Sequence, residues 1–135
     1  MEFERTVRFM LGDMVFEYDE DKNRINIRKH GISFRNAARV FFDYDRIEMF
    51  DEENSTDEDR YDTIGDTSAG YLAQGSSTTI GNVGQSDERK YDILFVVYTE
   101  RKQLIMDGRV VDVTRLISAR MATNFERGLY YGKYE

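Results

Sequence analysis

The 135-residue chain contains no cysteine, no proline and no tryptophan, and it has a single histidine. Without cysteine, disulfide bonds and thiolate metal sites are excluded, a composition that suits a reducing compartment. No apolar run approaches the ~20 residues that a membrane span requires. The first residues are charged and lack the apolar core of a secretory signal. We therefore expect a cytoplasmic protein without membrane contact.

The charge of the chain is unevenly distributed. Its net charge of −7 argues at first against binding to nucleic acid. However, residues 43–90 carry a net charge of −9, whereas residues 1–42 and 91–135 each carry +1. The two flanking segments can therefore still form a cationic surface. The acidic middle would oppose non-specific binding to polyanions, because affinity for a nucleic-acid backbone depends on neutralising phosphates.

Three segments have the signature of a capped helix. Asp19 precedes a segment with acidic residues in its first turn and basic residues in its last, and Gly31 ends it. In the second segment, apolar residues at helical spacing follow the capping residue Ser33. The third segment opens with a Thr-x-x-Glu capping box. The predicted helices span residues 20–30, 33–42 and 123–131.

Strands are predicted between these helices, with no crossover helix to join them in parallel. The sheet should therefore be mostly antiparallel. Asp107-Gly108 predicts a two-residue type I′ hairpin turn. The strongest strand, residues 91–98, has the continuous apolar run of a central strand. The other predicted strands span residues 7–11, 15–18, 46–50, 60–64, 104–106, 109–111 and 113–119.

The sequence thus predicts one α+β domain over residues 1–135, with two N-terminal helices and one C-terminal helix. Residues 1–13 are interpreted as an N-terminal extension. Residues 71–90, rich in Gly, Ser, Thr and Gln, are interpreted as a flexible loop. Residues 51–59 contain six acids in nine positions. That run lacks the spacing of a calcium loop, so a solvated charge run is favoured over a cation site.

The first helix carries the first candidate site. Lys22, Asn26 and Lys29 share one helical face, where two ammonium groups and an amide can hold a phosphate. His30, the only histidine, has the ordinary pKa near 6.5 that suits proton transfer at neutral pH. The alternative for Lys29 and His30 is structural, since basic residues stabilise the C-terminus of a helix.

The last two strands carry the second candidate site. Arg115, Ser118 and Arg120 lie in one predicted strand, where Ser118 and Arg120 share a face, and antiparallel pairing can bring Arg101 to the same rim. Guanidinium groups suit the charge that develops in phosphoryl transfer. The alternative is that these arginines pair with the abundant carboxylates. The chain has no Gly-rich phosphate loop, nucleophile elbow or zinc-binding histidine pair, which excludes those enzyme classes.

Together these segments resemble the BrnT-like family of bacterial toxins. The most specific runs are Lys-His-Gly-Ile-Ser-Phe at residues 29–34 and Ile-Ser-Ala-Arg-Met-Ala-Thr at residues 117–123. The likeness extends from about residue 15 to residue 131. The chain departs from the family pattern at residues 1–13, 71–90 and 102–113, and Tyr18 stands where the family has tryptophan.

The resemblance implies a RelE-like fold and cleavage of RNA that blocks translation. It also implies a cognate antitoxin as partner, a hetero-oligomeric complex with it, and contact with DNA only through that antitoxin. No cofactor or metal is expected. The implied catalytic residues are Arg101, Arg120, Lys29 and His30. The implied substrate-binding residues are Lys22, Asn26, Arg60, Arg115 and Ser118.

Two hypotheses remain open from the sequence. In the first, the chain is a metal-independent endoribonuclease in which the RNA's own 2′-hydroxyl attacks the adjacent phosphate. Arg120 and Arg101 then stabilise the developing charge, and Lys29 or His30 assists proton transfer. In the second, the chain is an inactive BrnT-like protein that acts as a protein-interaction module. The net acidity and the inserted loop motivate this second hypothesis.

Overall fold

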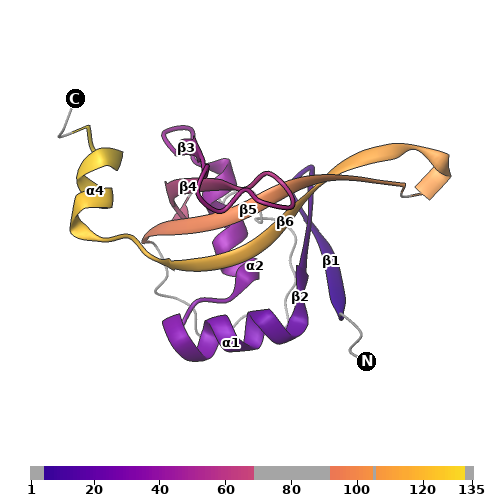
Figure 1. Ribbon diagram of the computed structural model, residues 1–135, viewed down its shortest axis with the longest axis horizontal. Helices are drawn as coiled ribbons and strands as arrows, with labels where there is room; N and C mark the ends of the chain where they lie inside the picture. Colours follow the sequence, from indigo (N-terminus) through magenta and orange to yellow (C-terminus); the bar gives the residue numbers. More distant parts are fainter. Residues whose placement is uncertain (1–4, 69–91, 105, 133–135) are drawn as a thin grey trace.

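The computed structural model describes residues 5–68, 92–104 and 106–132. Within these ranges six strands form one sheet in the order β1-β2-β6-β5-β4-β3 (Figure 1). All neighbouring pairs are antiparallel except β2 and β6, which are parallel. The predicted α+β class with a mostly antiparallel sheet is confirmed. The strands are β1 (Thr6–Leu11), β2 (Met14–Asp19), β3 (Ile47–Phe50), β4 (Tyr61–Asp66), β5 (Ile93–Leu104) and β6 (Val110–Met121).

The first helix, α1 (Glu20–His30), has the ends that its sequence predicts. The side chain of Asp19 accepts a hydrogen bond from the backbone N–H of Asp21, which caps the N-terminus. Gly31 ends the helix with a φ of 74°, and its N–H donates to the carbonyl of Ile27. A left-handed residue at this position is the usual helix stop, and glycine adopts it without steric cost.

The second predicted helix is corrected by the structure. Residues 33–42 form only a four-residue helix, α2 (Phe34–Ala37), followed by a 3₁₀ helix, η1 (Ala38–Phe42). Ser33 caps α2 as predicted, since its hydroxyl accepts from the backbone of Asn36. The tighter 3₁₀ turn is common at helix ends. Here it carries Val40 and Phe41 into the core.

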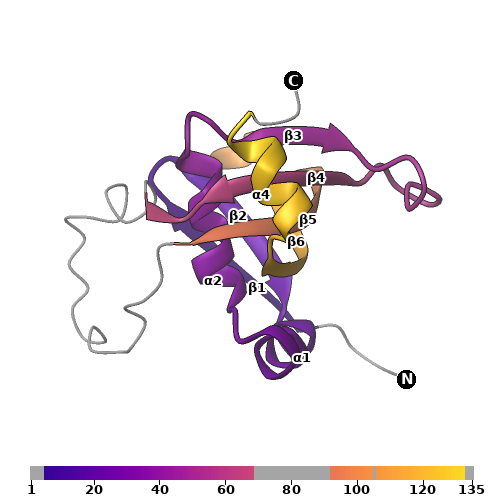
Figure 2. The ribbon, with the colours of Figure 1, turned by 90° about the vertical axis from the view of Figure 1, so that its left-hand side faces the viewer.

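The hydrophobic core lies between the sheet and the segment formed by α2 and η1. The ring of Phe16 in β2 lies 5.5 Å from that of Phe41, and Tyr18 meets Phe34 edge-on at 5.6 Å. Of the two N-terminal helices, α2 lies on this side of the sheet, while α1 lies along the edge of β6, where Asn26 bonds to Ala119 (Figures 1 and 2). We call the side that faces α2 the core face and the opposite side the outer face.

The C-terminal helix, α4 (Asn124–Tyr130), is separate from the other helices and lies beyond the end of β6 (Figure 1). The predicted capping box is confirmed, because Thr123 and Glu126 exchange side-chain-to-backbone hydrogen bonds. The RelE-like expectation that the helices pack at one side of the sheet stays a prediction. None of the helices in the described ranges is long and apolar enough to cross a membrane.

Residues 1–13 were predicted as an extension, but their described part belongs to the sheet. β1 pairs antiparallel with β2, so that Val7 lies opposite Tyr18 and Phe9 opposite Phe16. The stacked rings of Phe9 and Phe16 are 5.4 Å apart. The predicted strand at residues 7–11 is therefore confirmed as an edge strand that helps to cover the core.

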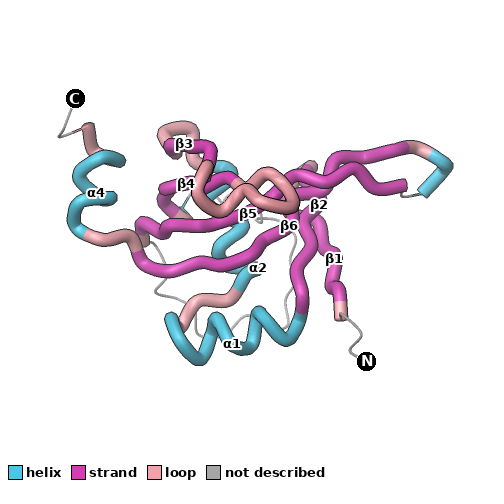
Figure 3. The backbone as a smooth tube through the Cα atoms, viewed as in Figure 1, coloured by secondary structure: helices cyan, strands magenta, loops and turns pink. Residues whose placement is uncertain are grey.

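The longest strands are β5 and β6, whose ladder runs from Leu94 opposite Met121 to Leu104 opposite Val110 (Figure 3). Asp107 and Gly108 have φ of 60° and 71°, as a type I′ turn requires. The predicted two-residue turn is nevertheless wrong, because residues 105–109 separate the last paired residues. The predicted flexible loop at residues 71–90 lies outside the described residues.

Candidate functional site

Several candidate side chains from the last two strands lie on the outer face. Val96 and Ala119, which pair across β5 and β6, belong to the core. Because side chains alternate along a strand, the neighbouring Ser118 and Arg120 point to the outer face. The same alternation places Arg101 and Arg115 there, since Leu116 and Tyr98 are core residues. These four candidates thus share one face, as the sequence predicted for Ser118, Arg120 and Arg101.

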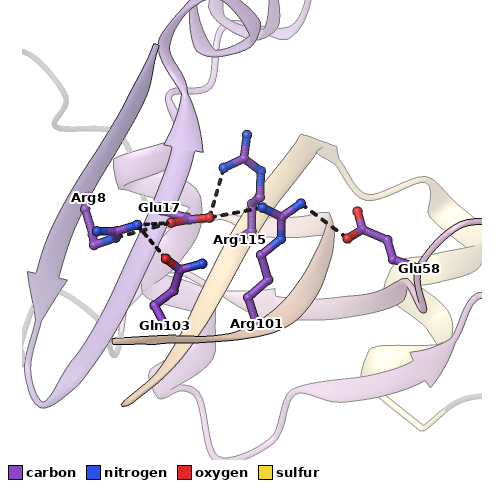
Figure 4. Close-up of polar contacts among 6 residues, drawn as sticks. All are labelled: Arg8, Glu17, Glu58, Arg101, Gln103 and Arg115. Carbon is purple, nitrogen blue, oxygen red and sulfur yellow. Dashed lines mark hydrogen bonds and ion pairs between the residues drawn. The ribbon is translucent and has the colours of Figure 1, made fainter. Parts of the chain in front are cut away.

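One buried carboxylate holds three guanidinium groups at the end of this face nearest β1 and β2 (Figure 4). Glu17 accepts hydrogen bonds of 2.9 Å from both Arg8 and Arg115, and Arg101 lies 3.5 Å from it. Glu17 is 1% exposed. Burial opposes its ionisation, but the bonds from Arg8 and Arg115 outweigh burial and lower the pKa of the carboxyl. We call Glu17, Arg8, Arg101 and Arg115 the Glu17 cluster.

The acidic segment between β3 and β4 reaches the Glu17 cluster. Glu58 lies 3.3 Å from Arg101 (Figure 4), and the hydroxyl of Thr99 donates to the carbonyl of Asp59 at 2.7 Å. Asp51 accepts hydrogen bonds from the backbone and side chain of Asn54, which order the start of the segment. Residues 51–60, which we call the acidic loop, therefore lie against the outer face.

Arg120 forms a second cluster at the other end of the β5–β6 ladder. Its guanidinium stacks 4.2 Å from the ring centre of Phe95 and makes two bonds, of 2.8 and 3.0 Å, to Glu126. These hydrogen bonds raise the pKa of Arg120 and lower that of Glu126. Since Glu126 also caps α4 through the N–H of Thr123, the helix fixes the position of Arg120. We call Arg120, Phe95 and Glu126 the Arg120 cluster.

Sequence reasoning missed an acidic side chain between the two clusters. Asp62 in β4 pairs with Val97, whose other partner is Ser118, so it belongs to the same row of the outer face. Burial first, and then the charge of Asp51, raise its pKa to about 6. Its buried Oδ1 has no hydrogen-bond partner in the described part of the chain. An acid inside the apolar strand pattern at residues 61–64 was the available signal.

Replacing Asp62 by asparagine should raise the stability of the protein at pH 8. Its pKa of about 6 in the folded protein exceeds the ordinary aspartate pKa of 3.8. The fold therefore binds this proton more tightly than the unfolded chain, and stability falls as pH rises between these values. Allowing for solvent screening, the variant should gain about 1–2 kcal/mol at pH 8.

Urea unfolding at pH 4, 6 and 8 measures this effect, with Asp57→Asn as the matched control in the exposed loop. The control should keep the pH dependence of the native protein. The account of Asp62 is wrong if Asp62→Asn also keeps it.

Asn26 was predicted to contact the substrate, but its side chain is buried and bonds to the protein backbone. It is 6% exposed, and its amide exchanges two hydrogen bonds with the backbone of Ala119, at 2.8 and 3.2 Å. It also donates to the carbonyl of Ile32 at 2.9 Å. β2 pairs with β6 only at residues 113–115, so Asn26 takes the place of a neighbouring strand beside Ala119. The amide thus fixes α1 beside Ser118 and Arg120.

The other basic candidates differ in their exposure. The side chains of Lys22, Lys29 and His30 on α1 are exposed and make no hydrogen bond or ion pair within the described ranges, and Arg60, just before β4, is partly buried. Arg115 is almost fully buried against Glu17. Lys22 and Lys29 flank Asn26 on its helical face, which is the face that meets β6.

The predicted single pocket is not formed by the described residues. Arg101 and Arg120 belong to separate clusters, and six residues along β5 place these about 20 Å apart. Each guanidinium has a carboxylate partner, which is the alternative that the sequence left open. A hollow of about 390 Å³ lies near the β1–β2 turn and contains none of the candidates.

Sequence comparison adds the decisive observation. The model of a family described as the ribonuclease toxin BrnT of type II toxin-antitoxin systems matches residues 18–83. Residues 18–83, which are 66 of the 135 residues, are similar to the BrnT-like toxin family. No curated protein matches it in sequence.

The match ends at a clear boundary within the fold. It covers α1, α2, η1, β3 and β4, and therefore includes Lys22, Lys29, His30 and Arg60. It ends before β5 and β6, which carry the guanidinium groups of the outer face. The family is one of ribonuclease toxins that act with an antitoxin. The roles of individual residues are left to the geometry.

Proposed function

We propose that this BrnT-like protein is a metal-independent endoribonuclease that inhibits translation and is restrained by a cognate antitoxin. The observation that carries the proposal is the presence of two guanidinium clusters on one face of the β5–β6 ladder. A face of this kind can bind several phosphates of one single strand, because each cluster offers planar donors suited to phosphate oxygens. The family description supports RNA cleavage and an antitoxin partner.

The chemistry requires no covalent help from the protein. The 2′-oxygen of RNA attacks the adjacent phosphorus and the bond to the 5′-oxygen breaks, leaving a 2′,3′-cyclic phosphate and a 5′-hydroxyl. One proton leaves the 2′-hydroxyl and one reaches the 5′-oxygen. Arg120 stabilises the charge on the phosphate oxygens. Lys29 or His30 transfers protons or holds the backbone, since Asn26 fixes α1 beside Arg120.

The remaining candidates contribute to substrate binding in this proposal. Arg101, Lys22, Arg60 and Ser118 contact the RNA backbone. Arg115 acts through its buried bond to Glu17. The antitoxin forms a hetero-oligomer with the protein in the cytoplasm, and DNA is reached only through the antitoxin.

Expression of the chain alone in bacteria tests the proposal. We expect growth arrest together with loss of messenger RNA, and both should disappear when the antitoxin encoded beside it is expressed with it. Lys29→Ala and His30→Ala should relieve the arrest if proton transfer depends on α1. Normal growth with intact messenger RNA would contradict the proposal.

A second function is favoured by one specific observation. Both Arg101 and Arg120 already have carboxylate partners, as expected if the outer face serves only structure and protein binding. The protein is then an interaction module without catalysis. Tight binding to the antitoxin together with unchanged RNA, measured on the purified chain, would favour this function.

A further inference from the structure

The guanidinium of Arg120 keeps one edge free for a ligand. Its Nη1 donates to the carbonyl of Met121 and to one carboxylate oxygen of Glu126, and its Nη2 donates to the other oxygen of Glu126. The Nε–H and the second N–H of Nη2 lie together on another edge of the planar group. They make no hydrogen bond within the part of the chain that the structure describes. Two parallel donors of this kind match two oxygens of one phosphate.

The direction of this free edge depends on the position of α4. Phe95 supports one face of the Arg120 guanidinium at 4.2 Å, and Glu126 holds its other edge. Glu126 is itself held at the start of α4 by the N–H of Thr123, at 2.8 Å. A movement of α4 therefore moves the free edge as well. Displacement of a catalytic group by about 1 Å can remove much of its effect on a reaction.

Two contacts hold the second half of α4, which lies against β4 (Figure 2). Arg127 lies 3.1 Å from Asp92, but these side chains are 38% and 35% exposed, so that solvent screens their attraction. Tyr130 donates its hydroxyl to Oδ2 of Asp43 at 2.6 Å, and Asp43 is only 7% exposed. A short bond from a hydroxyl to a carboxylate is among the stronger hydrogen bonds. Tyr130 is therefore the main polar anchor of this end of α4.

Asp43, which lies between η1 and β3, is a fixed point for this anchor. Its Oδ2 also accepts from the backbone N–H of Asp66, at the end of β4, at 2.8 Å. Burial, and then the bond to Asp43, raise the pKa of Tyr130, so its hydroxyl keeps the proton that it donates. Contacts thus connect the sheet to Tyr130 and, one helical turn away, Glu126 to Arg120.

We propose that Tyr130 is a positioning residue for RNA cleavage, whose bond to Asp43 holds α4 so that the free edge of Arg120 faces the phosphate that is cut. The inference rests on the proposed function and adds to it a residue that does not touch the RNA. Because Tyr130 acts only through Arg120, loss of its hydroxyl should slow the chemical step and leave RNA binding almost unchanged.

Single-turnover cleavage of a labelled RNA by Tyr130→Phe tests the inference, since this change removes only the hydroxyl. The rate at saturating protein should fall about tenfold. The protein concentration that gives half of this rate should change by less than about twofold. Tyr131→Phe is the matched control, because the adjacent Tyr131 is 57% exposed and its hydroxyl makes no hydrogen bond within the described ranges. The control should cleave at the native rate.

A second background separates positioning from a general loss of structure. In Arg120→Ala, the further change Tyr130→Phe should leave the remaining rate as it is, because the group that Tyr130 positions is gone. Thermal unfolding of each variant shows that the fold is retained. An equal loss of rate in the native and Arg120→Ala backgrounds, or a native rate in Tyr130→Phe alone, overturns the inference.

Nitrogen-15 relaxation of the Nε–H group of Arg120 tests the same contact without cleavage. The signal is assigned by its loss in Arg120→Lys. Its order parameter should be about 0.85 in the native protein and in Tyr131→Phe, and below about 0.6 in Tyr130→Phe. An equally rigid Arg120 in Tyr130→Phe overturns the inference. The expected loss of rigidity in a protein that cuts no RNA overturns the proposed function and leaves the anchoring of Arg120 by Tyr130 standing.

Discussion

Replacement of Arg120 by alanine should slow RNA cleavage by about 100-fold or more, the usual cost of removing a donor that contacts the charge of the transition state. The side chain is suited to this role because Phe95 and Glu126 hold its guanidinium on the outer face before RNA binds. A side chain that is already fixed loses little conformational entropy when the transition state forms, which lowers the barrier to reaction. Cleavage of a labelled RNA under single-turnover conditions measures the effect.

The matched control is Arg109→Ala, which removes an exposed arginine at the end of the β5–β6 hairpin. Its rate should stay close to that of the native protein. Arg120→Lys keeps the charge without the planar fork, and we expect an intermediate rate. Because Arg120→Ala also breaks the pair with Glu126, thermal unfolding must show that the variant is folded. Native cleavage rates in folded Arg120→Ala would remove this residue from the mechanism.

Replacement of Glu17 by alanine should lower the free energy of unfolding by about 3–5 kcal/mol, the typical cost of leaving buried charges without their partner. The variant leaves the buried guanidinium of Arg115 without this carboxylate and leaves Arg8 and Arg101 to repel it. Urea unfolding at pH 7 measures the loss. Glu53→Ala, at an exposed position of the acidic loop, should change stability by less than about 0.5 kcal/mol.

The pH dependence gives an independent check on Glu17. Its pKa in the folded protein lies below the ordinary glutamate pKa of 4.5. The carboxylate therefore contributes stability above pH 4.5, and this contribution is lost as pH falls through the folded pKa. Glu17→Ala should lose this part of the acid sensitivity. The same acid sensitivity in the variant and the native protein would contradict the role given to Glu17.

Local signals explain which parts of the fold were predictable. The ends of α1 depend on Asp19 and Gly31, which act within a few residues of each other. The capping box of α4 is equally local. The turn between β5 and β6 was predicted at the right residues, Asp107 and Gly108, but the connection between the paired strands is longer than the two residues predicted. The positive φ of Asp107 follows from its residue type, whereas the register depends on the whole ladder.

The candidate site depended on contacts between distant residues. Arg115 and Glu17 are 98 positions apart, and Asn26 and Ala119 are 93 apart. The strand pattern was sufficient to place Ser118 and Arg120 on one face. It could not indicate that Glu17, in the second strand, would hold three arginines, or that Glu58 would reach Arg101. These contacts follow from the strand order and from the position of the acidic loop.

The chemical ends of the RNA products test the central claim most directly. The purified protein should cut RNA in the presence of excess EDTA. The new ends should be a 2′,3′-cyclic phosphate and a 5′-hydroxyl, because the 2′-oxygen is the nucleophile. A substrate with a single 2′-deoxy substitution at the cut position should stay intact at that position. Cleavage that requires a divalent metal, or products with a 5′-phosphate, would contradict the account.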